Sequence, residues 1–151
     1  VNGDESGDRI MRIADVLRGK GSSVATVAPT ATVGELVAAL AEHNVGALPV
    51  IDTGQLVGIV SERDVVRRLH LGGAGLLQLS VADIMSSSVT TCAPGDKIED
   101  LARIMTQRRF RHMPVLENGE LIGIVSIGDL VKARIDALET EREQLQSYIA
   151  G

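Results

Sequence analysis

The sequence predicts an α+β protein made of two copies of one β-α-β-β-α unit that cover each other, followed by a C-terminal helix. The chain has 151 residues, of which 44% are hydrophobic, so it can bury one compact core or two small ones. Short runs rich in Val and Ile alternate with stretches of helical periodicity. The motifs of the first half return in the same order in the second half.

The repeat keeps a constant spacing. Three pairs of matching residues are each 65 positions apart: Pro29 and Pro94, Pro49 and Pro114, and Asp64 and Asp129. Upstream, Ile13 matches Val81 at a spacing of 68, so the first copy carries three extra residues near Lys20. A unit of roughly 55 residues buries only about 60% of its surface alone, so each copy needs the other as cover.

In the first copy, a short β-branched strand is expected at residues 24–27, ended by Pro29. Thr32-x-x-Glu35 has the spacing of a capping box and predicts a helix over residues 33–43. Residues 49–52 and 56–60 are predicted strands joined by the Thr53-Gly54 turn, and a second helix is expected over residues 61–69.

The second copy predicts the same elements. Asp96-x-x-Glu99 has the spacing of a capping box, Glu117-Asn-Gly119 repeats the turn, and a helix is expected from Ser126 onward. The helical pattern continues into the tail with apolar residues three to seven apart: Leu130, Ile135, Leu138, Leu145 and Ile149. This apolar stripe can pack on the protein's own body or on a second copy, and both alternatives remain open.

These patterns divide the chain into four segments. Residues 1–10, rich in Gly and acidic side chains, are predicted to be a disordered lead. The first repeat spans residues 11–75, the second spans residues 76–135, and residues 136–151 form the helical tail. The glycine-rich stretch at residues 72–75 is the expected linker.

Charge and composition limit the kinds of partner that the protein can bind. A net charge of −5 and an aromatic content of 1% argue against nucleic acid, which needs cations for its phosphates and aromatic rings for its bases. A small anionic ligand stays compatible with this charge. The single cysteine, Cys92, cannot form an internal disulfide, and there is no apolar run of about 18 residues to cross a membrane. We therefore expect a cytoplasmic protein without a membrane partner.

The ordered motifs resemble those of tandem cystathionine-β-synthase (CBS) domains, a pair of which is called a Bateman module. They are Val24-x-Thr-x-x-Pro29, Gly46-Ala-Leu-Pro-Val-Ile-Asp52 and Gly58-Ile-Val-Ser-x-x-Asp64, with second copies that end in Ser126-x-x-Asp129. The resemblance covers residues 11–134, and the tail is similar to that of small standalone bacterial members. It implies repeats packed through their sheets about a pseudo-two-fold axis, and a homodimer. It also implies two clefts for an adenosine ligand (AMP, ADP, ATP, NAD or S-adenosylmethionine), with no obligatory cofactor.

Two Ser-x-x-Asp motifs, Ser61 with Asp64 and Ser126 with Asp129, have the residue types that an adenosine ligand needs. A carboxylate can accept hydrogen bonds from both ribose hydroxyls. A serine where a strand meets a helix can hold a phosphate oxygen together with free backbone N–H groups. The same spacing is that of a capping box, in which the serine only stabilises the helix start. The two roles do not exclude each other.

Phosphate also needs cations, and the second copy has more of them just before its proline: Arg108, Arg109, Arg111 and His112. The family resemblance places Arg111 and His112 toward the cleft. Arg108 and Arg109 are expected to be a solvated helix end whose charges favour the C-terminal dipole. Arg63 in the first motif is replaced by Gly128 in the second, so the two clefts should differ in chemistry.

The adenine base is expected to lie against small apolar side chains, with backbone groups after Thr26 and Thr91 at its edge. The candidates are Val27, Val45 and Ala47 in one cleft, and Cys92, Phe110 and Met113 in the other. All of these residues are equally good candidates for the core.

Three classes of function are considered for this sequence. The first is a non-catalytic sensor that binds an adenine nucleotide and acts on an unknown effector protein. The second is a ligand-free scaffold for protein–protein interaction, in which Ser-x-x-Asp only caps helices. The third, an enzyme, is disfavoured because the sequence has no nucleophile motif, no G-x-x-x-x-G-K loop and no His/Cys cluster with metal spacing.

Overall fold

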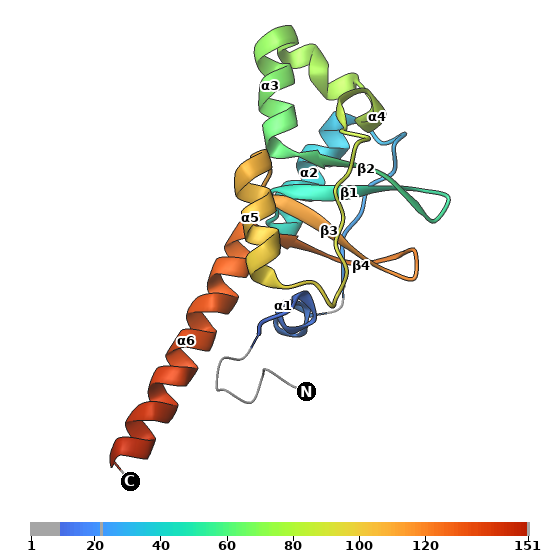
Figure 1. Cartoon of the computed structure of the whole chain (residues 1–151). Coiled ribbons are helices and arrows are strands. Elements are labelled where there is room, and N and C mark those ends of the chain that lie inside the picture. Colours follow the sequence, from blue (N-terminus) through green and yellow to red (C-terminus); the bar gives the residue numbers. More distant parts are fainter. Residues whose placement is uncertain (1–9, 22, 151) are drawn as a thin grey trace.

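Figure 1 shows the computed structural model of the chain, which describes residues 10–21 and 23–150. The elements in chain order are α1 (Ile13–Lys20), α2 (Val33–His43), β1 (Ala47–Asp52), β2 (Gln55–Ser61), α3 (Glu62–Gly72), the 3-10 helix η2 (Gly73–Gln78), α4 (Val81–Ile84), α5 (Ile98–Arg108), β3 (His112–Glu117), β4 (Glu120–Ser126) and α6 (Ile127–Ala150). The predicted α+β class with two repeats and a C-terminal helix is confirmed. Residues 1–9 of the predicted disordered lead lie outside the described residues.

Each repeat holds one antiparallel hairpin, β1 with β2 and β3 with β4. The registers are equivalent, with Pro49 opposite Ile59 and Pro114 opposite Ile124. Both residues of each turn have positive φ, as in type I′ turns: Thr53 and Gly54 in the first hairpin, Asn118 and Gly119 in the second. The predicted hairpins are therefore present, and their right-handed twist matches the turns that join them.

The predicted strand at residues 24–27 is wrong in extent, because only Val27 pairs with its neighbour. It forms a single parallel bridge to Val50, with hydrogen bonds from Val27 N to Pro49 O (3.0 Å) and from Ile51 N to Val27 O (2.9 Å). A longer parallel ladder would need N–H donors from Pro49 on one side and Pro29 on the other, and proline has none. The second repeat has the same limit, with one bridge between Cys92 and Val115.

The helices begin at different kinds of cap in the two repeats. The Thr32 side chain accepts a hydrogen bond from Glu35 N, which confirms the predicted capping box of α2. The predicted box of Asp96 and Glu99 is wrong: α5 has Lys97 at its N-cap without a side-chain cap. Asp96 instead accepts a hydrogen bond from Ala93 N at 2.8 Å and stabilises the preceding turn.

The glycine-rich stretch at residues 72–75 is not a loose linker. Gly72 ends α3, and η2 begins directly at Gly73. Leu76 of η2 is only 3% exposed and belongs to the first core. This segment therefore packs as a part of the fold.

The N-terminal helix of each repeat crosses to the core of the other. Ile13 and Val16 of α1 pack with the β3–β4 hairpin, whereas Val81 and Ile84 of α4 pack with the β1–β2 hairpin. Equivalent backbone hydrogen bonds hold the two crossings, from Val81 N to Ala31 O (2.8 Å) and from Ile13 N to Asp96 O (2.9 Å). This exchange accounts for the pseudo-two-fold arrangement and ties the repeats into one body. The boundary assigned at residue 75 stays a prediction.

Each hairpin has a glycine where a segment of the other repeat packs closely against it. A Cβ atom on Gly58 would lie 2.6 Å from Met85 Sδ and 2.9 Å from Ser86 O, and one on Gly123 would lie 2.7 Å from Leu17 Cδ2. Real Cβ atoms do not approach so closely. Gly58 is therefore required where the Ser86 backbone lies against it, whereas at Gly123 the flexible Leu17 side chain could move aside.

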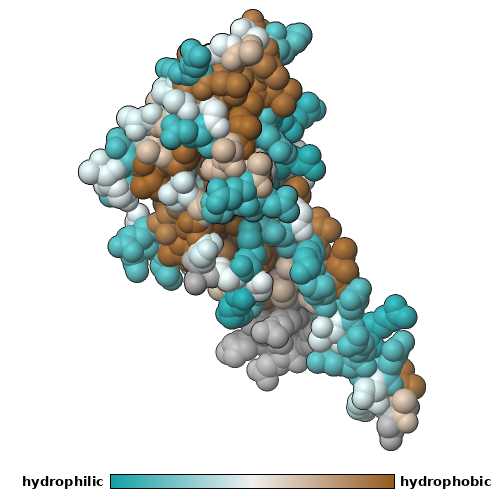
Figure 2. All heavy atoms as spheres, turned by 180° about the vertical axis from the view of Figure 1, so that it is seen from behind, coloured by the Kyte–Doolittle hydropathy of each residue, from teal (hydrophilic) through white to brown (hydrophobic). Residues whose placement is uncertain are grey.

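Helix α6 leaves the body of the molecule, and its C-terminal half stands alone (Figure 1). Leu130, near its start, is the only buried residue that it contributes among those described. Figure 2 shows this part as mainly hydrophilic, with apolar patches near its root and at its tip. The predicted helical tail is thus the outer part of one continuous helix.

Candidate functional site

A cavity of about 1280 Å³ lies between the two repeats, larger than the 300–1,000 Å³ usual for small-molecule sites. The first repeat lines it from the start of β1 and the junction of β2 with α3, and the second from the end of α5 and the start of β3. The third wall comes from residues 85–90 after α4, which we call the crossing segment; in Figure 1 it runs past both hairpins. The lining residues are Gly46, Ala47, Ile59, Ser61, Glu62, Arg63, Asp64, Val66, Arg67, Ser86, Ser88, Val89, Thr90, Met105, Thr106, Arg108, Arg109, Phe110, Arg111, His112 and Ile127.

Asp64 has one carboxylate oxygen engaged at the cavity wall. Its Oδ2 accepts hydrogen bonds from Ser61 N (2.8 Å) and Ser61 Oγ (3.0 Å), and Asp64 N faces Ser61 Oγ at 3.4 Å. This is the capping box at the start of α3. No hydrogen bond from a described residue reaches Oδ1. The cap therefore orients the carboxylate and leaves acceptor capacity for a ligand.

Cations dominate the charge of the cavity, although the whole chain is acidic. Five arginines line it, against the two carboxylates of Glu62 and Asp64: Arg63, Arg67, Arg108, Arg109 and Arg111. Arg109 ends α5 in the left-handed conformation, with φ of 61°. This bend brings its carbonyl oxygen within 3.3 Å of Arg63 Nη1. An anion placed here would meet positive charge from both repeats.

His112 lies where the two hairpins adjoin. A Cβ atom on Gly46 would be 3.3 Å from His112 Cε1 and also 3.3 Å from Glu62 Oε1. Burial lowers the pKa of His112 below its usual value, while the charges of Glu62 and Asp129 raise it in part. The imidazole is therefore biased toward its neutral form, which can both donate and accept a hydrogen bond.

Asp129, the counterpart of Asp64, is already paired. Its Oδ2 accepts hydrogen bonds from Lys20 Nζ (2.7 Å) and from Ser126 N (2.8 Å), and Ser126 Oγ accepts one from Asp129 N (3.1 Å). Burial alone would raise the pKa of Asp129, but the hydrogen bonds from Lys20 and Ser126 outweigh it, so the pKa lies below its usual value. The two Ser-x-x-Asp motifs thus share a cap and differ in their surroundings.

The cavity brings together half of the residues singled out from the sequence. Those that line it are Ala47, Ser61, Arg63, Asp64, Arg111 and His112. Those that do not line it are Thr26, Val27, Thr91, Met113, Ser126 and Asp129. Met113 is 1% exposed and packs in the second core, so it offers no surface to a base.

Arg108, Arg109, Phe110 and Cys92 also have defined places in the structure. Arg108 and Arg109 are exposed at the end of α5, as expected of a solvated helix end, and they also line the cavity. Phe110 and Ala47 were expected in different clefts, but both line the cavity that holds Asp64. Cys92 is buried in the second core, and burial raises the pKa of its thiol to about 12, so it is not a cleft residue.

Other lining residues were missed by sequence reasoning. Ser86, Ser88 and Thr90 enter through the crossing segment, which no motif marks. Arg67 follows Asp64 by one helical turn, and this spacing could have placed it on the same face. The contact of Lys20 with Asp129 was also missed. The three extra residues near Lys20 were the signal that could have indicated it.

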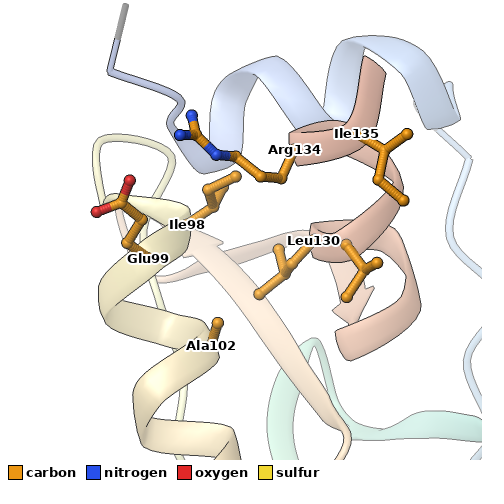
Figure 3. A pocket seen from close by; sticks show the side chains of 7 residues that line it. Ile98, Glu99, Ala102, Leu130, Arg134 and Ile135 are labelled. Atoms are coloured by element: carbon orange, nitrogen blue, oxygen red, sulfur yellow. The ribbon is translucent and has the colours of Figure 1, made fainter. Parts of the chain in front are cut away.

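A second, smaller pocket of about 250 Å³ lies between α5 and α6. Figure 3 shows the apolar side chains of Ile98, Ala102, Leu130 and Ile135 around it, together with Glu99 and Arg134. Its volume is below the range usual for ligand sites and its lining is mostly apolar, so we do not assign it a nucleotide.

Residues 10–21 and 23–150 contain no group of three or more His, Cys, Asp or Glu side chains placed to hold a metal ion. Among the same residues, no helix is both long and apolar enough to cross a bilayer.

Comparison with known proteins identifies both repeats. Residues 13–71 and 81–136 each match the family model of the CBS domain. The CBS domain-containing protein CBSX3, mitochondrial, of Arabidopsis thaliana is 36% identical over 157 residues, covering 98% of this chain and 76% of that protein. A CBS-domain protein structure from Agrobacterium tumefaciens, ATU1752, has 45% identity and a TM-score of 0.80 over 82% of this chain and 99% of that one. The structure of CBSX2 in complex with AMP has 30% identity and a TM-score of 0.68 over 83% and 96%.

Proposed function

This chain belongs to the CBS domain family as a tandem CBS pair, and on that premise we propose that it is a non-catalytic regulatory module that binds an adenine nucleotide. The proposed site is the cavity between the repeats, and the single observation that carries the proposal is its composition: the oriented carboxylate of Asp64 and five arginines line the same cavity. Ribose hydroxyls and phosphate need these two chemistries side by side. The ligand class comprises AMP, ADP, ATP and NAD.

Asp64 is the proposed ribose acceptor. Its Oδ2 is held by Ser61, so the carboxylate is oriented before any ligand arrives. A preorganised acceptor loses little freedom on binding, which favours affinity. Ser61 stands at the N-cap of α3, whose positive end adds to the attraction for a nearby phosphate.

The arginines are the proposed phosphate ligands. Arg63 comes from the first repeat, whereas Arg109 and Arg111 come from the second. Guanidinium groups bind phosphate oxygens in pairs of parallel hydrogen bonds. His112 and the Ser86 and Ser88 hydroxyls supply further polar groups.

The apolar part of the lining is the proposed place of the base. Ala47 and Ile59 come from the first hairpin, Val89 comes from the crossing segment, and Phe110 comes from the second repeat. A purine ring could bury its apolar faces against these side chains. The AMP bound to CBSX2, which is 30% identical, supports an adenine ligand in this chain.

Ligand binding between the repeats is the proposed signal. Because residues from both repeats would contact one molecule, their packing free energy becomes linked to ligand concentration. A cytoplasmic effector protein that recognises one packing would then read this concentration. A catalytic role has little support, since the cavity offers cations and one carboxylate but no activated nucleophile among its described residues.

A homodimer through α6 is proposed as the form of the module. The exposed apolar residues of this helix follow a heptad pattern with spacings of four, three, seven and four: Val131, Ile135, Leu138, Leu145 and Ile149. Their exposures run from 46 to 81%, a surface that a second copy of the same helix would cover. Arg134 and Glu139 flank the stripe five residues apart, the spacing at which opposite charges meet across a parallel pair of helices.

The direct test of the proposed function is isothermal titration of the purified full chain with AMP, ADP, ATP and NAD, alongside thermal unfolding with each ligand. Binding to the folded state must raise the melting temperature. If all four ligands leave both heat and melting temperature unchanged, the nucleotide proposal fails and the scaffold interpretation takes its place.

A further inference from the structure

The two Ser-x-x-Asp motifs are equivalent by sequence but not by contact. In both, the serine caps the helix and the aspartate Oδ2 accepts the serine N–H at 2.8 Å. Asp64 has no cation bonded to it among the described residues, whereas Asp129 accepts a hydrogen bond from Lys20 Nζ at 2.7 Å. Lys20 thus shares Oδ2 of Asp129 with the Ser126 N–H and pairs with the charge of the carboxylate.

Lys20 reaches this position because of the three extra residues in the first repeat. Helix α1 runs for eight residues, whereas its counterpart α4 runs for only four. The difference amounts to about one additional helical turn. It carries α1 past the point where α4 ends and brings Lys20 over the β3–β4 hairpin.

A backbone contact in the first half is replaced by this side chain in the second. After α4 the chain forms a bridge in which Ile59 and Ser86 exchange two hydrogen bonds of 2.9 Å each. Ile124, the counterpart of Ile59, has its carbonyl oxygen bonded to Lys20 Nζ at 2.8 Å instead. One ammonium therefore serves both the free carbonyl and the aspartate.

The two half-sites consequently offer different surroundings to a ligand. Around Asp64, the crossing segment contributes the small, uncharged side chains of Ser86 and Ser88, which leave the cavity open. Around Asp129, the long cationic side chain of Lys20 contacts the carboxylate and neutralises its charge. A ribose at Asp129 would compete with Lys20 for the carboxylate, and displacement of Lys20 would also leave the Ile124 carbonyl without its donor.

We infer that the chain takes one nucleotide, at the Asp64 half-site, and that Lys20 is the specificity-determining residue that keeps the Asp129 half-site closed. This inference rests on the proposed function. A charge-assisted hydrogen bond corresponds to roughly a 10- to 100-fold effect on an equilibrium. Because Lys20 and Asp129 are 37% and 25% exposed, the lower end of that range, about tenfold, is expected.

The test counts the ADP bound per full-length chain by isothermal titration. Wild type is expected to bind one ADP per chain. Lys20→Ala, and Lys20→Met with its apolar stem retained, should each bind a second ADP, with a site at least about tenfold tighter than in wild type. Adding Asp129→Ala to Lys20→Ala should return the number to one. Arg18→Ala is the matched control, since it removes a cation from the same helix and should stay at one.

Two outcomes would overturn the inference alone: wild type binds two ADP per chain, or both Lys20 variants stay at one. If wild type binds two ADP and Lys20→Ala binds one, Lys20 is a phosphate ligand instead of a block. If wild type binds no nucleotide, the proposed function itself fails, and this inference fails with it. Melting temperatures of all variants identify any that do not fold.

Discussion

Arg63 and Arg109 join the two repeats across the cavity: Arg63 Nη1 donates a hydrogen bond of 3.3 Å to the carbonyl oxygen of Arg109. Arg63 lies in the first turn of α3, and Arg109 ends α5. Both side chains line the cavity. An anion bound between them would attract both guanidinium groups and change the free energy of contact between the repeats, which is the property that a sensor needs.

The Asp64→Asn variant should lose about 10- to 100-fold in affinity for ADP, because a carboxylate that accepts ribose hydrogen bonds is replaced by a neutral amide. Asparagine keeps an oxygen that can still accept the Ser61 N–H, so α3 retains its cap. Titration calorimetry gives the affinity. Asp129→Asn is the matched control and should bind ADP like wild type. Equal affinities for wild type and Asp64→Asn would remove Asp64 from the ribose site.

The Arg111→Ala variant should weaken ADP by about tenfold and leave adenosine nearly unchanged, because the guanidinium meets phosphate and not the nucleoside. Arg111 is exposed, so the affinity of wild type for ADP should also fall as salt concentration rises. Competition binding measures both ligands. Arg103→Ala, on α5 but outside the lining, is the control. A parallel loss of ADP and adenosine would indicate a structural effect of Arg111.

The Gly58→Ala variant should destabilise the fold by about 1–3 kcal/mol, the usual effect of overpacking. The added methyl would meet Ser86 O at 2.9 Å, and a backbone atom cannot move aside easily. Gly123→Ala should cost less, because its methyl meets only the flexible Leu17 side chain. Gly95→Ala has nothing within 4 Å and serves as control. Urea unfolding ranks the three, and an equal effect at Gly58 and Gly95 would contradict the close crossing.

The His112→Gln variant should flatten the pH dependence of stability below about pH 6.5. Burial lowers the pKa of His112 in the folded state, so the unfolded chain binds the proton first as pH falls. The free energy of unfolding of wild type should therefore be highest above the ordinary pKa and decline as pH falls toward the folded-state pKa. Denaturant titrations from about pH 8 to pH 5 measure this slope. His70→Gln, at an exposed position of α3, should keep the wild-type slope.

Removal of the chain after Arg134 should convert the proposed dimer to a monomer, as measured by light scattering. Leu138→Asp should do the same without removing the helix, because it places charge in the apolar stripe. Arg142→Leu should strengthen the dimer, since Arg142 occupies the one heptad position of the stripe that is not apolar. An unchanged mass in both disruptive forms would exclude α6 from the interface.

Local sequence signals predicted the elements well where short-range chemistry decides them. The Thr32 and Glu35 box marked the start of α2, and the Thr53-Gly54 turn marked the first hairpin. The strand at residues 24–27 was overestimated because its pairing depends on proline positions in a different segment, Pro49. The Asp96 box failed because a nearer partner, Ala93 N, competes for the same carboxylate.

The site was only partly predictable, because it depends on contacts between repeats. Asp64 and Arg111 carry a motif or a family position, and both line the cavity. The exchange of α1 and α4 has no local signature, since the same apolar residues would fit either core. Because of this exchange, Ser86 lines the cavity that holds Asp64, and Lys20 reaches Asp129. A chemical difference between the clefts was expected from Arg63 and Gly128. The structure adds a second cause, Lys20, which is distant in sequence from Asp129.

The most direct test of the account is a crystal structure of the full chain grown with ADP. We expect electron density for one ADP in the cavity between the repeats, with both ribose hydroxyls within hydrogen-bond distance of Asp64 and the phosphates against Arg63, Arg109 and Arg111. A well-ordered protein with this cavity empty at saturating ADP, or with ADP bound away from Asp64, would contradict the proposed function.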